Sequence, residues 1–118
     1  MIWLGVALLG AAGALARFAL DGAVSSRAGG DLPYGTLVVN LTGAFALGAL
    51  SGAGASGDAL TLVGTGALGS YTTFSTWMLE SQRLGEDGRT RPLALNVAVS
   101  LAAGLAAAAL GRVLAGAV

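Results

Sequence analysis

The chain has 118 residues, of which 55% are hydrophobic and only 10% are charged, whereas a soluble domain carries roughly 25% charged residues. Six basic residues balance six acidic ones, and this zero net charge argues against nucleic acid as a partner. Because the chain has no Cys and no His, disulfides, thiol chemistry, zinc sites and imidazole catalysis are excluded. Length and composition predict a single membrane domain over residues 1–118.

Charged residues separate four apolar segments, which we expect to cross the membrane as helices over residues 2–20, 33–52, 59–80 and 92–115. A spanning helix needs about 20 apolar residues, and the last three segments meet this length. The first segment is shorter, but Arg17 can extend its side chain toward the membrane surface. A signal peptide is the alternative for this segment, although it lacks a basic start and three further spans follow. The predicted fold is an all-α membrane protein with four transmembrane helices.

The second segment carries one strongly polar side chain, Asn40, within GTLVVNLTG. The side-chain amide offers two N–H donors. In a membrane helix such an amide either bonds to a neighbouring helix and holds the bundle together, or faces a pore as a donor. The residue pattern leaves both alternatives open.

The third segment contains GSYTTFSTW (69–77), with five Ser and Thr hydroxyls. Gly64, Gly66 and Gly69 precede Thr72 and Thr73. Glycine weakens a helix, and hydroxyls can bond to the backbone groups that a broken helix frees. We therefore expect a central interruption near residues 69 to 73. Carbonyls at such a break can hold a cation and amides an anion; a kink without a ligand is the alternative.

Two aromatic residues of this segment, Phe74 and Trp77, lie three positions apart and therefore share a helix face. The edge of an aromatic ring is electropositive. Together with hydrogen-bond donors, two such edges can hold an anion that has shed its water. Core packing is the alternative for Phe74 taken alone.

The fourth segment places Asn96, Ser100 and Gly104 at intervals of four residues. This spacing aligns the three along one stripe of a helix. The surrounding residues are Ala, Val and Leu. The stripe is either a packing contact between helices or a polar track along a narrow path, and the spacing favours neither.

No Asp, Glu, Lys or Arg lies deep within a predicted span. A proton-coupled antiporter needs a titratable carboxylate near the middle of the membrane, so a small multidrug-type antiporter is disfavoured. The hydroxyls also lack a general base, so no enzyme site is visible. A non-transporting membrane assembly subunit is a third hypothesis.

Arginines are distributed unevenly between the two ends of the predicted bundle. The end with both termini has Arg112, and the other end has Arg17, Arg27, Arg83, Arg89 and Arg91. The positive-inside rule places the second end in the cytoplasm. The chain also has 20 glycines, and small residues let membrane helices approach closely. We therefore expect a tight oligomer.

Three stretches together resemble the Fluc (CrcB) fluoride channel family: GAAGALARF (10–18), PYGTLVVNLTGAFALG (33–48) and GALGSYTTFSTW (66–77). Their order and spacing agree with the family over nearly the whole chain. The resemblance implies a passive channel that exports fluoride across the inner or plasma membrane. It also implies an antiparallel dimer with two pores, surrounded by lipid.

The resemblance implies roles for individual residues. Asn40 is similar to the pore-facing asparagine of the family, and Phe74 to the first of the paired phenylalanines that flank fluoride. The backbone carbonyls of Gly69 and Thr72 are similar to those that bind a central structural sodium ion at the dimer interface. The other implied pathway residues are Arg17, near the aqueous entrance, and Thr73, Ser75, Asn96 and Ser100.

The chain departs from the family pattern at Trp77, which stands where the second phenylalanine is common, and at Ser70, which stands where glycine is common. The ring edge and the indole N–H of Trp77 can still meet an anion. The uneven arginines fit poorly with insertion in both orientations. The family includes paired homologues of fixed, opposite orientation, so the resemblance leaves a homodimer and a heterodimer with a homologous subunit both open.

Overall fold

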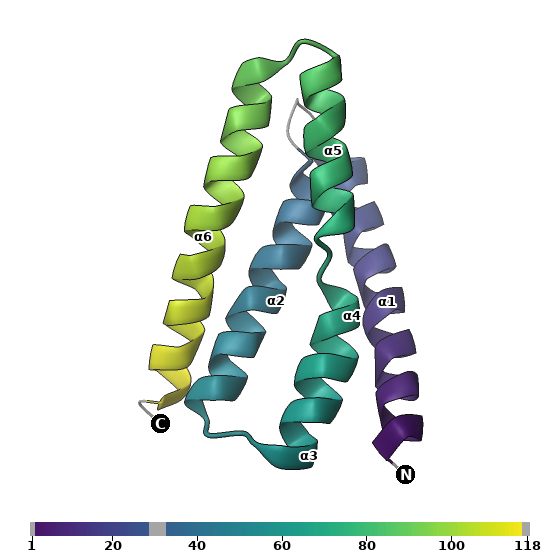
Figure 1. The fold of residues 1–118 in the computed structure, drawn as a ribbon, viewed down its shortest axis with the longest axis vertical. Coiled ribbons are helices and arrows are strands. Elements are labelled where there is room, and N and C mark those ends of the chain that lie inside the picture. The colour runs from purple at the N-terminus through teal and green to yellow at the C-terminus, as the bar shows by residue number, and fades with distance from the viewer. Residues whose placement is uncertain (1, 29–32, 117–118) are drawn as a thin grey trace.

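The computed structural model describes residues 2–28 and 33–116. All elements within these residues are helical (Figure 1): α1 (Ile2–Arg27), α2 (Tyr34–Gly52), α3 (Gly57–Ala59), the π-helix η1 (Leu60–Leu68), α4 (Gly69–Tyr71), α5 (Ser75–Glu86) and α6 (Thr90–Gly116). Three of them, α1, α2 and α6, are long and apolar enough to cross a membrane. These three correspond to the first, second and fourth predicted spans.

Two of the observed helices, α1 and α6, are longer than the spans that the sequence predicts. α1 continues past residue 20 to Arg27, whose positive charge in the last turn complements the helix dipole. α6 begins at Thr90, two residues before Pro92, and proline is tolerated in the first turn of a helix. The third predicted span, residues 59–80, is divided among α3, η1, α4 and α5.

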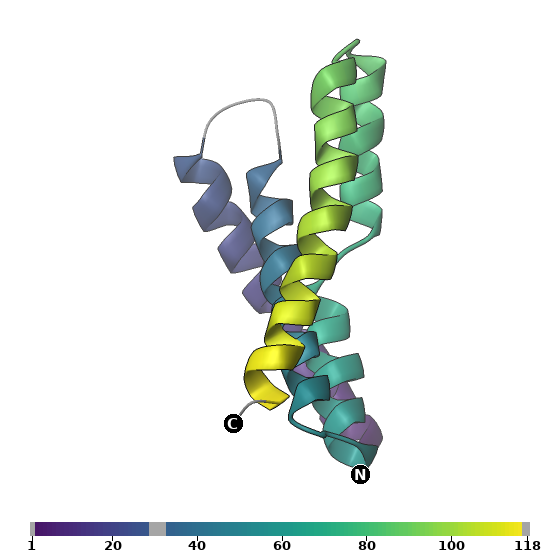
Figure 2. The same ribbon diagram turned by 90° about the vertical axis from the view of Figure 1, so that its left-hand side faces the viewer.

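The helices form two pairings that meet near the middle of the molecule. α2 packs along α6, whereas α1 packs against η1 and α4. Figures 1 and 2 show α5 beside the first half of α6, and α1 diverging from α6 at this end. The two ends of the described chain lie at the same end of the molecule as α3, and the turn between α5 and α6 lies at the opposite end (Figure 1).

Glycines bring the helix backbones into direct contact. A Cβ atom at Gly48 would collide with the carbonyl group of Ala108, and one at Gly111 would collide with the carbonyl group of Phe45. Gly13 meets the backbone of η1 in the same way. Lipid tails are as apolar as the helix side chains, so the hydrophobic effect does not drive membrane helices together. Close packing of this kind stabilises their association instead.

The segment from α3 to α5 is irregular in two places. At the end of η1, the N–H of Gly69 bonds to the carbonyl of Gly64, five residues earlier, and π-helical turns are frequent at functional sites. The helix then ends at Tyr71, Thr72 is extended with φ −80° and ψ 161°, and α5 starts at Ser75. The interruption at residues 72–74 therefore begins inside the predicted window.

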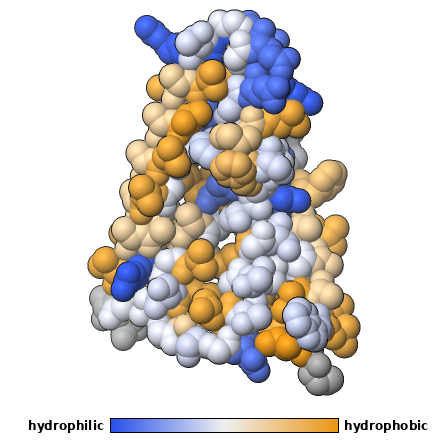
Figure 3. All heavy atoms as spheres, viewed as in Figure 1, coloured by the Kyte–Doolittle hydropathy of each residue, from blue (hydrophilic) through white to orange (hydrophobic). Residues whose placement is uncertain are grey.

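Very little apolar side chain is enclosed by the chain itself. Of the described hydrophobic residues only Val39 and Leu84 are buried, whereas Trp3 and Phe18 are more than 80% exposed. Figure 3 shows extended apolar surface, with the largest group of hydrophilic residues at the end that carries the α5–α6 turn. A surface of this kind suits hydrocarbon, or a second subunit, as its surroundings.

Candidate functional site

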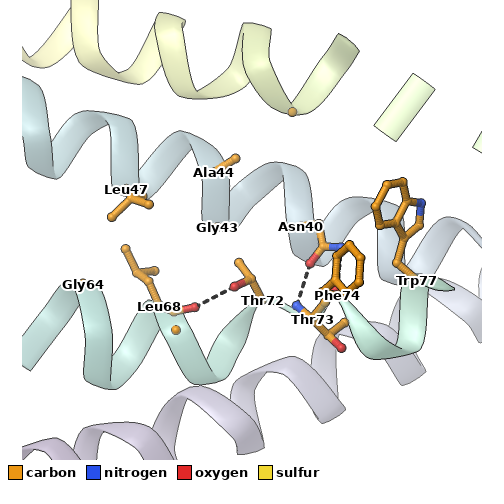
Figure 4. A pocket seen from close by; sticks show the side chains of 12 residues that line it. Asn40, Gly43, Ala44, Leu47, Gly64, Leu68, Thr72, Thr73, Phe74 and Trp77 are labelled. Carbon is orange, nitrogen blue, oxygen red and sulfur yellow. Dashed lines mark hydrogen bonds between the residues drawn. The ribbon is translucent and has the colours of Figure 1, made fainter. Parts of the chain in front are cut away.

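The side chain of Asn40 on α2 pairs with the backbone N–H and C=O of Thr73 at the interruption (Figure 4). Its Nδ2 atom donates to the carbonyl of Thr73 at 2.9 Å, and the N–H of Thr73 donates to Oδ1 of Asn40, also at 2.9 Å. These bonds satisfy backbone groups that the broken helix leaves free. The second N–H of the amide takes part in neither bond. Asn40 therefore holds α2 to the interruption and retains one donor.

Threonine hydroxyls complete the two helix ends at the interruption. Oγ1 of Thr72 donates to the carbonyl of Leu68 at 3.0 Å, which closes the end of α4 (Figure 4). Oγ1 of Thr73 accepts from the N–H of Thr76 at 3.2 Å, as hydroxyls near a helix N-terminus commonly do. The hydroxyls thus bond to the backbone in the manner that the sequence predicts.

A further hydroxyl pair joins the interruption to α2. The hydroxyl groups of Tyr71 and Thr42 lie 2.7 Å apart. Beneath this pair, a Cβ at Gly43 would meet the side chains of Tyr71 and Thr72. The glycine therefore lets the end of α4 lie directly on α2.

The carbonyls of Gly69 and Thr72, which the family resemblance assigns to a sodium ion, have different surroundings. The N–H of Thr73, which an unbroken helix would direct to Gly69, bonds to Asn40 instead, so the Gly69 carbonyl loses its usual donor. The Thr72 carbonyl accepts from Nη1 of Arg17 at 3.4 Å. Sodium is a hard cation that takes oxygen ligands, and a guanidinium opposes a nearby cation. The fit to sodium is therefore supported at Gly69 and opposed at Thr72.

A pocket of about 370 Å³ lies beside the interruption (Figure 4). Its wall is mostly apolar and includes Asn40, Gly43, Leu47, Leu68, Thr72, Thr73, Phe74, Trp77 and Gly104. Phe74 lines the pocket and is nevertheless 69% exposed, so the pocket opens to the surface. The rings of Phe74 and Trp77 meet edge to face, with centroids 5.6 Å apart and planes at 73°.

A second, more polar pocket of about 220 Å³ lies on the side of α1. It is lined by Arg17, Phe18, Asp21, Thr36, Val39, Thr73 and Thr76. Thr73 lines both pockets, so the Asn40–Thr73 pair stands between an apolar pocket and a polar one. The structure therefore groups Arg17, Asn40, Thr73, Phe74 and Trp77 around the interruption.

Three of the predicted pathway residues line neither pocket. Asn96 is only 3% exposed, and its Nδ2 atom donates to Oγ of Ser81 at 2.8 Å. Ser75 is exposed at the start of α5, and Ser100 is partly buried on α6. Of the predicted stripe on α6, only Gly104 reaches the pocket wall.

The indole N–H of Trp77 is directed to α6. Nε1 donates to the carbonyl of Asn96 at 3.4 Å, and Figure 4 shows this nitrogen on the side of the indole away from Asn40. The ring itself lines the pocket. Of the two groups of Trp77 that the sequence offers to an anion, only the C–H edge is available to the pocket.

Two buried polar groups near the polar pocket were not expected from the sequence. Oγ1 of Thr36 and Oε1 of Glu80 are both buried. The two side chains are neighbours across α2 and α5. One feature of the sequence could have indicated that the carboxylate of Glu80 is partly buried. Glu80 follows Trp77 by three residues and therefore lies on the same side of the helix.

The chain is similar to known proteins over almost its whole length. The family model CrcB-like protein, Camphor Resistance (CrcB), matches residues 4–112. Fluoride-specific ion channel FluC 2 of Mycolicibacterium paratuberculosis is 54% identical over 97% of this chain and 93% of its own length. The FluC 2 protein of Haloarcula marismortui is 50% identical over 81% of this chain and 78% of its own length. Fluoride-specific ion channel FluC 1 of Frankia casuarinae is 42% identical over 100% of this chain and 98% of its own length.

These relatives are named as ion channels and not as enzymes. Together with the three apolar helices of membrane-spanning length, they place the chain in the cell membrane as a multi-pass protein. The match to the family model covers far more than half of the sequence. The chain belongs to the CrcB-like family.

Proposed function

We propose that the chain forms a passive, fluoride-selective channel that exports fluoride from the cell. The observation that carries this proposal is the Asn40–Thr73 pair. It holds a neutral amide donor at a helix interruption, between an aromatic pocket and a polar pocket that contains Arg17. The names of the relatives support fluoride as the ion.

The proposed path replaces the water of fluoride by uncharged groups. A small anion holds its water tightly, and a fixed positive charge in the path would bind it too strongly to release it. The amide of Asn40 and the ring edges of Phe74 and Trp77 offer donors and positive edges without a full charge. Arg17 then acts at the polar pocket, where its charge raises the local concentration of anions.

In this proposal the segment from α3 to α5 also crosses the membrane, as the third of four crossings in chain order. Its course from one end of the molecule to the other supports this (Figure 1). Irregular backbone at membrane depth is tolerated only where protein or water surrounds it. The open pocket beside the interruption therefore faces a second subunit.

The second subunit lies antiparallel to the first in the proposed channel. Relatives named FluC 1 and FluC 2 support pairing with a homologous chain, and a homodimer is the alternative. The Gly69 carbonyls of the two subunits hold the proposed central sodium ion. The ion supplies positive charge that offsets the cost of bringing an anion into a medium of low dielectric constant.

The proposal is tested by fluoride efflux from liposomes that contain the purified chain, alone and together with a homologous subunit. We expect efflux without any proton gradient, at a rate that an imposed gradient does not change. Efflux that requires the gradient would instead indicate an antiporter. A folded chain that is silent with and without the homologous subunit would overturn the channel and favour an assembly subunit.

A further inference from the structure

Three hydrogen bonds form a closed circuit between α5 and α6. Nδ2 of Asn96 donates to Oγ of Ser81 at 2.8 Å, and the hydroxyl of Ser81 donates to the carbonyl of Trp77 at 2.8 Å. The indole N–H of Trp77 donates back to the carbonyl of Asn96 at 3.4 Å. The circuit lies on the side of Trp77 that faces α6, outside both pockets.

Because the circuit is largely buried, the loss of any of its hydrogen bonds is costly. Ser81 is 4% exposed and Asn96 is 3% exposed, so loss of either side chain leaves a buried polar group without its partner. The one hydroxyl hydrogen of Ser81 goes to Trp77, and its oxygen accepts from Asn96. The hydroxyl is therefore the junction between the backbone of α5 and the amide on α6.

The circuit also determines which part of the indole reaches the pocket. With Nε1 bonded to α6, the ring meets Phe74 edge to face at 73°. A rotation that aimed the N–H into the pocket would break the bond to Asn96 and disturb the contact with Phe74. The six-membered part of the ring system thus presents C–H groups, as a phenylalanine would.

We propose that Ser81 and Asn96 are positioning residues that fix the indole of Trp77, so that it offers a C–H edge and not its N–H to the anion path. The three hydrogen bonds hold the indole in this orientation whether or not the chain conducts fluoride. The effect of that orientation on the ion rests on the proposed channel function. Asn96 therefore holds Trp77 from the side that faces α6, and does not itself line the path.

The test uses Trp77 as its own reporter. A Trp3→Phe background leaves one indole, because the chain has two tryptophans and Trp3 is 83% exposed. In this background, Ser81→Ala removes the junction, whereas Ser81→Thr keeps a hydroxyl at the same place. Hydrogen exchange of the indole N–H is followed by ¹H–¹⁵N NMR in detergent, and fluoride efflux is followed in liposomes. Ser26→Ala, on the exposed end of α1, is the matched control.

Ser81→Ala removes two of the three hydrogen bonds, and neither of these is the bond of the indole itself. We expect the weaker contact between α5 and α6 to accelerate exchange of the indole N–H up to about tenfold and to lower fluoride efflux. Ser81→Thr should restore both. Unchanged indole exchange in a folded Ser81→Ala protein would overturn the proposal, and so would a Ser81→Thr protein that behaves like the alanine variant. If Ser81→Ala does not fold, Asn96→Ala opens the circuit from the other side and is judged by the same indole signal.

The two proposals fail in different ways. A parent protein that shows no fluoride efflux, alone or with a homologous subunit, would contradict the channel function, but its indole exchange would still decide the orientation of Trp77. A parent protein with efflux, whose indole N–H exchanges as fast as that of a free indole, would contradict the positioning role and leave the channel function standing.

Discussion

Asn40 and Thr73, 33 positions apart in the chain, are joined by two hydrogen bonds of 2.9 Å that pair a side-chain amide with both backbone groups of one residue. In an antiparallel sheet, a residue of the neighbouring strand would make a similar pair of bonds. Here the amide takes the place of the helical partners that Thr73 lacks. The side chain of Asn40 thus both holds the backbone of the interruption and lines the pocket.

Replacement of Asn40 by Asp should abolish fluoride efflux. A carboxylate cannot donate to the carbonyl of Thr73, and its negative charge repels an anion. Asn40→Leu separates the two causes, because it removes the donor without adding charge. We expect residual efflux from the leucine variant and none from the aspartate variant, measured with a fluoride electrode on liposomes. Wild-type efflux from a folded Asn40→Asp protein would refute the role of Asn40 in the path.

Arg17→Gln should lower efflux most strongly at low ionic strength. Its guanidinium lines the polar pocket and donates to Thr72, and attraction of an anion by an accessible charge is screened over about 10 Å at 0.1 M salt. The measurement is the initial efflux rate across a series of salt concentrations. Arg27→Gln, at the exposed end of α1, serves as the control. An equal loss at every salt concentration would show that Arg17 acts only by holding the interruption.

The hydroxyl pair of Tyr71 and Thr42 should contribute measurably to stability. Tyr71→Phe removes one partner of the 2.7 Å contact, and Thr42→Val removes the other. Interhelical hydrogen bonds in membrane proteins contribute about 0.6 kcal/mol on average. A double-mutant cycle of unfolding in detergent should give a coupling energy of about this size. Strictly additive effects would mean that the two hydroxyls do not interact.

Gly48→Ala should destabilise the packing of α2 on α6. The added methyl group meets the backbone carbonyl of Ala108, and backbone cannot move aside as a flexible side chain can. Overpacking of this kind costs about 1–3 kcal/mol. Thermal unfolding in detergent measures the loss. Gly22→Ala is the control, since a Cβ at Gly22 meets no atom within 4 Å, and equal unfolding temperatures in the two variants would contradict the close contact.

The uneven arginines predict one fixed orientation for this chain in the membrane. The chain has no cysteine, so single cysteines report accessibility cleanly. A cysteine at Ser56, on the α3 end, should react with an impermeant reagent added outside intact cells, whereas one at Ser26 should react only after permeabilisation. Half-reaction at both sites would indicate insertion in both orientations, and therefore a homodimer.

The interruption could be predicted from the sequence because its causes are local. Gly64, Gly66 and Gly69 weaken the helix, and the hydroxyls that follow can bond to freed backbone groups. The π-helical turn of η1 could not be predicted, because the glycine spacing does not distinguish it from an α-helical turn, and the contact of Gly66 with the backbone of Val6 on α1 could not be predicted either. Spacing along one segment carries no information about such a contact.

The bonding of Asn96 and Asn40 shows the same limit. The interval of four residues correctly places Asn96, Ser100 and Gly104 on one side of α6, but it cannot say which neighbour each one meets. Asn96 meets Ser81, which lies one residue beyond the third predicted span. The sequence therefore predicts polar contacts for both asparagines, whereas the identity of their partners depends on the packing of α5 and α2.

The meeting of backbones at Gly48 and Gly111 constrains how this chain can evolve. Leucines and alanines that face hydrocarbon can be exchanged for one another over generations with little consequence. A single methyl group at either glycine would instead force two helices apart, and no substitution elsewhere on their surfaces can make room for it. Lineages should thus diverge widely on the outside of the protein while these two positions stay without a side chain.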